Sequence, residues 1–281
     1  MSIIEEIKKV YQDLSVQNDL SPHNPIVNKN LSNLVQQLNK TREDEDDTRI
    51  VCCDTCHQER VELPALCGQA ECEMEKYWAR FFLEKEQMTP TDLTEFWYHD
   101  NYQALWNAEK ELIAANNCQN KRIVFLGSGA LPLTMILGAI SWPNLTAVCV
   151  DFDDEAVDLS RSLIKKLHLE KQIEVQCISA KSYLFNSNDF VICASLLKNK
   201  SEVYNALYKA DITCFAIRDV EGCYCYLYHP AERPHPEQYT EKFIEEFTEK
   251  STKHTKTGVN HNCINTTKIF VKTSLPAPKS P

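Results

Sequence analysis

The chain has few glycines, no long apolar run and no surplus of positive charge. Glycine supplies only six of the 281 residues, so two glycines that fall in one short turn stand out. No stretch approaches about 18 consecutive apolar residues, so we expect no membrane-spanning helix. The formal net charge of −10 argues against nucleic acid and against an anionic membrane surface as partners. The composition is otherwise that of an ordinary soluble globular protein.

The beginning of the chain lacks the features of a secretion signal. Acidic residues occur early, at Glu5 and Glu6, and no apolar core of signal-peptide type follows them. We therefore expect a cytoplasmic protein. The sequence does not fix the oligomeric state, and a homodimer is one option.

Thirteen cysteines are present, but an odd number in a chain without a signal peptide does not indicate a disulfide scaffold. The cluster of Cys52, Cys53, Cys56 and His57 contains the C-x-x-C-H haem-attachment pattern, whose chemistry needs an exported protein. A structural zinc site formed by Cys53, Cys56, His57 and Cys67 is another alternative. The second C-x-x-C of such sites is missing, however, so we expect reduced thiols and no protein-bound metal.

Residues 1–120 show helical patterning, with apolar side chains at helical spacing and few strand signals. The expected helices cover residues 3–14, 26–38, one or two helices within 48–86, and 96–115 after a start signal at 91–95. We therefore predict a helical N-terminal domain over residues 1–120.

From Arg122 onward, short apolar runs alternate with helical stretches, which is typical of a parallel sheet covered on both faces. The expected strands are residues 122–126, 146–151, 172–177, 189–194 and 211–217, followed by 223–228 and 267–272 around a helix at 236–250. A final strand running antiparallel would match a methyltransferase-type sheet. The fold class is therefore α/β, with a Rossmann-like domain over residues 121–274 and a disordered proline-rich tail over 275–281.

The most informative segment runs from Ile123 to Thr134 and is followed by a second apolar run that ends in Asp151. It combines a buried strand, a turn containing Gly127 and Gly129, and a helix start. Glycine permits a sharp turn and close approach of a ligand, and a carboxylate at Asp151 can accept both hydroxyls of a ribose. This pattern predicts a nucleoside site, the alternative being an ordinary β–α turn with a solvated acid.

The turn lacks two features of a dinucleotide site. Pro132 replaces the third glycine of G-x-G-x-x-G, and no lysine or arginine in the loop could bind phosphate. A nucleoside without phosphates fits better, and S-adenosylmethionine is the obvious candidate, since its amino-acid tail can reach the loop amides.

A second constellation lies in the helical half. Glu71 and Glu75 are four residues apart and so share one helix face, and an aromatic segment over 96–102 follows. The alternatives are a solvated helix face for the two acids and packing against the second domain for the aromatic segment.

Five motifs together resemble the nicotianamine synthase family. They are Leu66-Cys-Gly-x-Ala-Glu71, Tyr98-x-x-Asn-Tyr102, Leu126-Gly-Ser-Gly-x-x-Pro-Leu-Thr134, Asp151-x-Asp153 and Tyr226-Leu-Tyr228. The resemblance runs from the first helix to the last strand and implies a helical domain over a Rossmann-like domain. It also implies transfer of the 3-amino-3-carboxypropyl group of S-adenosylmethionine, with release of methylthioadenosine and formation of a metallophore that chelates metal after release.

The resemblance also implies roles for individual residues. Glu71 is the base that deprotonates the attacking amine, and Tyr102 positions or relays that proton. The S-adenosylmethionine site comprises Gly127, Ser128, Gly129, Leu131, Pro132, Thr134, Asp151 and Asp153, and the substrate-binding residues are Tyr98, Arg218 and Tyr224.

One departure from the family pattern leaves the acceptor open: Tyr224 stands where the family tends to carry a second basic residue. Another is that Ser179-Ala-Lys181 replaces the acid that often holds the adenine amine after the third strand. The acceptor is a second unit derived from S-adenosylmethionine, as in nicotianamine synthesis, or a free amino acid such as histidine, as in opine-metallophore synthases. A small-molecule methyltransferase and a binding module without turnover are the remaining alternatives, although Glu71 and Tyr102 argue against the latter.

Overall fold

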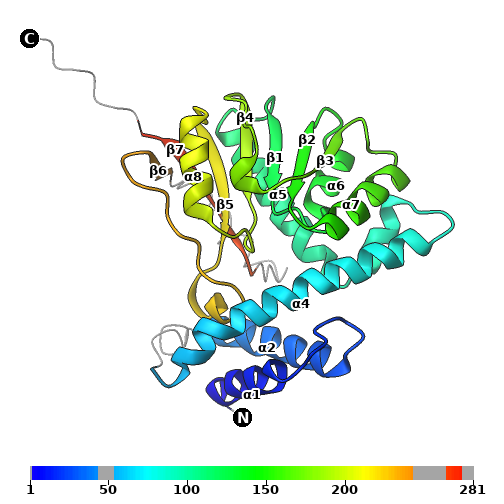
Figure 1. Ribbon diagram of the computed structural model, residues 1–281, viewed down its shortest axis with the longest axis vertical. Coiled ribbons are helices and arrows are strands. Elements are labelled where there is room, and N and C mark those ends of the chain that lie inside the picture. Colours follow the sequence, from blue (N-terminus) through cyan, green and yellow to red (C-terminus); the bar gives the residue numbers. More distant parts are fainter. Residues whose placement is uncertain (1, 44–53, 243–263, 274–281) are drawn as a thin grey trace, which may run out of the picture.

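The computed structural model describes residues 2–43, 54–242 and 264–273, and it has a helical layer beneath a mixed sheet (Figure 1). The helices of the first part are α1 (Ile3–Ser15), α2 (Pro25–Glu43), α4 (His57–Glu84) and α5 (His99–Ala115). Two short 3-10 helices, η1 (Asp54–Cys56) and η2 (Pro90–Glu95), precede α4 and α5. None of the helices in the described ranges is both long and apolar enough to cross a membrane.

Helix α1 illustrates how local sequence defines these elements. The Ser2 side chain accepts a hydrogen bond from the Glu5 N–H group, while the Glu5 carboxylate accepts one from the Ser2 N–H group, forming a capping box. Ile7, Val10 and Leu14 then fall on one face and are fully buried. Helices α1 and α2 pack together below the long helix α4, which crosses the molecule under the sheet (Figure 1).

The helix predicted from residue 96 begins three residues later, at His99. A capping box between Thr89 and Asp92 caps the N-terminus of the 3-10 helix η2, and the backbone at Phe96, which follows this helix, is extended. Because that conformation interrupts helical hydrogen bonding, α5 starts anew after the aromatic segment.

The sheet has seven strands in the order β3-β2-β1-β4-β5-β7-β6. Strands β1 (Arg122–Leu126), β2 (Ala147–Asp151), β3 (Ile173–Cys177), β4 (Asp189–Cys193) and β5 (Cys214–Asp219) run parallel, and β7 (Thr266–Lys272) is antiparallel to β5. Helices α6 (Leu133–Ser141), α7 (Asp154–Lys166) and α8 (Lys200–Lys209) connect them. The α/β fold class and the antiparallel last strand are therefore confirmed.

Two elements predicted near the C-terminus are wrong. The strand expected at 223–228 is a 3-10 helix, η4 (Gly222–Tyr226), which begins at a glycine with φ +59°. Its apolar side chains are buried against α2 and α4, away from the sheet. The helix expected at 236–250 contains strand β6 (Tyr239–Lys242), which pairs with β7. Residues 243–250 and the tail expected at 275–281 lie outside the described residues.

The two parts of the chain share a core. The cluster under the sheet contains apolar residues of α1, α2 and α4, and η4 and Ile264 contribute to the same cluster. Two other clusters cover the faces of the sheet, one with α5, α6 and α7 and one with α8. The division at residue 120 thus falls between α5 and β1 along the chain, but segments from beyond residue 120 complete the helical layer.

Candidate active site

The glycine-containing loop joins β1 to α6 at the carboxyl edge of the sheet. Gly127 and Gly129 have φ values of +75° and +66°, a region that favours glycine. The Gly129 N–H group donates to Oδ2 of Asp151 at 2.8 Å, and the Asp153 N–H group donates to Oδ1 of Asp151 at 3.0 Å. Because β1 and β2 are neighbouring parallel strands, the loop and the acid meet at one edge, where open α/β sheets bind ligands.

A cavity of about 1280 Å³ opens at this edge, between the sheet and helices α4 and α5. Most of the predicted site residues line it: Glu71, Tyr98, Tyr102, Gly127, Ser128, Gly129, Leu131, Asp151, Asp153 and Arg218. Pro132 and Thr134 are not among the described residues that line it. Pro132 immediately precedes α6, and Thr134 is fully buried, where its hydroxyl accepts a hydrogen bond from Arg218 at 2.8 Å.

Asp153 borders the cavity but has a structural role as well. Its side chain caps α7 by accepting hydrogen bonds from the N–H groups of Glu155 and Ala156, and it pairs with Lys76 at 2.7 Å. Burial raises the pKa of Asp153, but Lys76 and the two N–H groups outweigh it and hold the pKa below its usual range. Of the two predicted acids, Asp151 therefore has the greater capacity to bind a ligand.

Helix α4 presents Glu71 and Glu75 to the cavity, and α5 presents Tyr102 between them. The Tyr102 hydroxyl donates to Oε1 of Glu75 at 3.0 Å. Burial raises the pKa of Glu71, while hydrogen bonds from Tyr228 and Tyr102 act in the opposite direction. Burial and the nearby charge of Glu71 raise the pKa of Glu75 to about 8. Two carboxyl groups in one desolvated site cannot both ionise easily, so they titrate as a pair.

Arg218 lines the cavity but is already committed to a partner. It is buried, and its guanidinium donates to both carboxylate oxygens of Glu109, at 2.7 and 2.9 Å. Burial raises the pKa values of Glu71 and Tyr102, and the charge of Arg218 acts in the opposite direction on both. This ion pair links β5, which carries Arg218, to α5, which carries Glu109.

Tyr224 is not among the described residues that line the larger cavity, so we do not include it in the candidate site. It is fully buried in the cluster beneath the sheet, where its hydroxyl donates to Asn39 at 2.7 Å and the Arg42 guanidinium lies 5.1 Å from its ring centre. The reason is that η4 is helical where a strand was predicted, so the side chain packs against α2.

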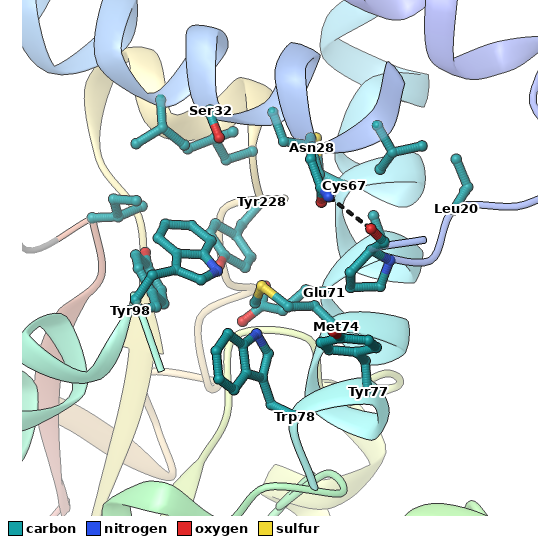
Figure 2. A pocket seen from close by; sticks show the side chains of 18 residues that line it. Leu20, Asn28, Ser32, Cys67, Glu71, Met74, Tyr77, Trp78, Tyr98 and Tyr228 are labelled. Atoms are coloured by element: carbon teal, nitrogen blue, oxygen red, sulfur yellow. Dashed lines mark hydrogen bonds between the residues drawn. The ribbon is translucent and has the colours of Figure 1, made fainter. Parts of the chain in front are cut away.

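A second cavity, of about 420 Å³, lies between α2, α4 and the two residues that follow η4, Leu227 and Tyr228. Figure 2 shows Glu71 and Met74 among the rings of Trp78, Tyr98 and Tyr228. Five of its lining residues are aromatic: Tyr77, Trp78, Trp97, Tyr98 and Tyr228. Only Glu71 and Tyr98 appear among the described lining residues of both cavities, so Glu71 stands at their junction.

The sequence analysis assigned no role in the site to Phe152, Glu75 and Asn101, which all line the larger cavity. Phe152 follows Asp151 and exposes 68% of its surface at the cavity edge, and Glu75 binds Tyr102. The Oδ1 atom of Asn101 is buried on the wall without a hydrogen-bond partner in the described part of the chain. Buried polar atoms without partners are rare and suit a site that expects a ligand. An exposed aromatic within Asp-Phe-Asp was the available signal for Phe152.

Within residues 2–43, 54–242 and 264–273, no group of three or more histidine, cysteine or acidic side chains is arranged to bind a metal ion. Cys52 and Cys53 of the predicted thiol cluster lie outside the described residues. Cys56 and Cys67 are buried. The zinc alternative therefore stays untested.

Comparison with known proteins gives consistent matches. A family model described as nicotianamine synthase protein matches residues 1–247. Nicotianamine synthase 1 of Arabidopsis thaliana is 29% identical over 170 residues, covering 58% of this chain and 52% of that protein. L-histidine 2-aminobutanoyltransferase of Yersinia pestis is 28% identical over 147 residues, covering 52% of each chain. The chain thus spans about half the length of these two curated relatives.

Two crystal structures of MtNAS have the same fold. The complex with MTA and tNA has a TM-score of 0.73 at 17% identity and covers 96% of this chain and 98% of that one. A mutant in complex with S-adenosylmethionine has a TM-score of 0.72 at 16% identity, with the same coverage. At such identity, the likeness establishes the fold alone.

Proposed function

The chain belongs to the nicotianamine synthase family, and from that premise we propose that it is a transferase that uses S-adenosylmethionine as substrate. It moves the 3-amino-3-carboxypropyl group to an amine acceptor and releases methylthioadenosine. The observation that carries this proposal is the place of Glu71, which lines both the nucleoside-type cavity and the aromatic cavity. One acid at the junction of two cavities suits a reaction between two bound molecules.

The larger cavity would hold S-adenosylmethionine. Asp151 accepts two backbone N–H groups already, but each carboxylate oxygen has two acceptor sites, so both ribose hydroxyls can still bind. The exposed ring of Phe152 would lie against the adenine. The loop from Gly127 to Leu131 would face the amino-acid tail. MtNAS, which has the same fold, has been crystallised with S-adenosylmethionine and with MTA.

The smaller cavity would hold the acceptor, with its amine toward Glu71. An amine is protonated at neutral pH, so it must give a proton to a base before it can attack. Glu71 would take that proton, and Tyr102 would orient or relay it. The nitrogen then attacks the methylene carbon bonded to sulfur, the C–S bond breaks, and its electron pair stays on sulfur. Since the sulfonium is an excellent leaving group, positioning supplies most of the remaining catalysis.

The product would be nicotianamine or a close relative, a metallophore that binds metal after release. A free amino acid such as histidine is the second candidate acceptor. The five aromatic side chains of the smaller cavity favour it, because they can stack on an imidazole or another ring. The name of the Yersinia pestis relative points the same way.

Mass spectrometry of the reaction products tests the function. The purified protein would be incubated with S-adenosylmethionine alone and then with added histidine. Methylthioadenosine should appear in at least one reaction, together with an aminocarboxypropylated product whose mass identifies the acceptor. Release of S-adenosylhomocysteine would instead indicate methyl transfer, and no turnover with bound S-adenosylmethionine would indicate a binding module.

A further inference from the structure

Glu75 lies against the glycine-containing loop, one helical turn along α4 from Glu71. A side chain at Gly129 would overlap the Oε2 atom of Glu75, so the loop and the carboxyl group are in direct contact. The N–H group of Leu131 hydrogen-bonds to Glu75 from the same loop, and Tyr102 binds Oε1 from α5. The carboxyl group is thus held in one position on the cavity wall by α5 and the loop.

Gly129 also contacts Asp151, because its N–H group donates a hydrogen bond of 2.8 Å to the Asp151 carboxylate. Glu75 and Asp151 therefore flank a single residue of the loop. In S-adenosylmethionine, one carbon separates the ribose ring from the sulfur. With the ribose hydroxyls on Asp151, the positively charged sulfur is held near Gly129 and within reach of Glu75.

The charges around Glu75 leave it without a cationic partner in the described part of the structure. Glu71 on its own helix and Asp151 from β2 are both acidic, and their charges add to burial in raising its pKa. The nearby cations have other partners. Lys76 binds Asp153 at 2.7 Å and Glu155 at 3.0 Å, and Arg218 binds Glu109. A buried carboxyl group in such surroundings is neutral until a cation arrives.

We propose that Glu75 is the counter-ion of the sulfonium: it releases its proton when S-adenosylmethionine binds and takes up a proton when the sulfur becomes neutral. This inference rests on the proposed function and assigns Glu75 as a substrate-binding residue. Asn101 supports a ligand here independently, since its buried, unpartnered Oδ1 atom lines the same cavity.

The proton balance of the transfer agrees with this role. The acceptor ammonium loses one proton, the new C–N bond forms, and the C–S bond breaks with its electrons left on sulfur. The sulfonium becomes a neutral thioether, and the product nitrogen carries one positive charge as a secondary ammonium. One proton is left over. It can pass from Glu71 through the Tyr102 hydroxyl to Glu75, which has just lost its cationic partner.

Calorimetric titration of the full chain with S-adenosylmethionine tests the proposal. Buffers of equal pH but different ionisation enthalpy give the number of protons released. With a free carboxyl pKa of about 8, binding at pH 7 should release close to one proton. Affinity should tighten by about tenfold between pH 6 and pH 7 and level off above about pH 8.

Glu75→Gln keeps the shape of the side chain but removes its charge. Its affinity should match that of the wild type near pH 6 and be weaker by about tenfold or more above pH 8. The amine of the ligand also titrates, but identically with both proteins, so the difference isolates Glu75. Glu84→Gln, at an exposed position of the same helix, is the control and should behave as the wild type.

S-adenosylhomocysteine separates the sulfur charge from the ammonium charge of the same ligand. The wild type should bind this neutral-sulfur analogue without the Glu75-dependent proton release, a result that needs no variant to fold. Equal proton release with both ligands, or release retained in Glu75→Gln, overturns the inference and leaves the transferase function standing. Failure of the wild type to bind S-adenosylmethionine refutes the proposed function instead.

Discussion

The two cavities that meet at Glu71 differ in how the chain builds them. The larger one combines a helix face with the ends of adjacent parallel strands and the loop between β1 and α6, so its nucleoside end is a property of local sequence. The smaller one collects side chains from α2, α4, the turn before α5, Leu227 and Tyr228 after η4, and Ile264. A local pattern can therefore identify the proposed donor site, whereas the proposed acceptor site forms only after the chain has folded.

The chemistry of the two cavities differs as well. The larger one presents carboxylates and backbone N–H groups, which suit a polar nucleoside with a positive charge. The smaller one presents aromatic rings and a single acid, Glu71, among its described lining residues. If this division is correct, substitutions on the two sides should affect different steps of the reaction.

The largest effect is expected at the junction. Glu71→Gln keeps the shape of the side chain but removes its basicity, so methylthioadenosine release should fall by about a hundredfold or more while S-adenosylmethionine still binds. Initial rates and calorimetry measure the two effects separately, with Glu84→Gln as the exposed control on α4. Normal turnover in Glu71→Gln combined with a loss of turnover in Glu75→Gln would exchange the roles of the two acids.

The next effect belongs to the donor side. Asp151→Ala removes a charged acceptor of hydrogen bonds, which typically costs about 1.5–3 kcal/mol, or roughly 10- to 150-fold in affinity for S-adenosylmethionine. Calorimetric titration measures it, and Asp158→Ala on the exposed face of α7 serves as the control. Unchanged affinity would move the ribose contact to Asp153 and weaken the distinction between the two cavities.

The same contrast between local and long-range structure explains how much of the fold could be predicted from the sequence. Strands 122–126 and 189–194 were predicted nearly to the residue, because each is a short apolar run buried on both faces. Strand 223–228 was predicted with the same logic and is helical, because its apolar residues are buried by α2 and α4. Apolar content predicts that a segment is buried, but it does not predict which helices or strands the segment packs against.

The site shows the same limit. Spacing placed Glu71 and Glu75 on one helix face, but only the fold shows Tyr102 bound to Glu75 and Glu75 against the loop. Tyr224 was assigned to the substrate from a family pattern, and the helical turn of η4 takes it to Asn39. Contacts between segments more than a hundred residues apart leave no local signal.

A smaller effect is expected at Tyr228 in the smaller cavity, where a substitution should change the pH dependence of the reaction. Tyr228 lines only the smaller cavity, and its hydrogen bond lowers the pKa of Glu71 against the effect of burial. Tyr228→Phe removes that stabilisation of the ionised form, so the pKa of Glu71 should rise. Because the base works only when ionised, the acidic limb of kcat should move to higher pH, by about 0.7 units for a hydrogen bond worth about 1 kcal/mol.

The pH profile of methylthioadenosine release measures that shift. Tyr77→Phe is the matched control, since Tyr77 lines the same cavity and has no hydrogen bond to Glu71 in the described structure. Equal shifts in the two variants would show that the cavity responds to any lost hydroxyl, and the specific link from Tyr228 to Glu71 would then be wrong.

The smallest effect is expected outside both cavities, at Tyr224. Its hydroxyl donates to Asn39 within the cluster that joins η4 to α2, and neither cavity has it among its described lining residues. Tyr224→Phe leaves the Asn39 amide oxygen without this donor, which should lower the free energy of unfolding by about 0.5–1.5 kcal/mol. The ratio of products made with and without added histidine should stay the same. Urea unfolding and product analysis measure the two quantities, with Tyr208→Phe on α8 as the control. A changed product ratio in a variant of normal stability would contradict this prediction. Tyr224 would then contribute to the acceptor site although it lines neither cavity.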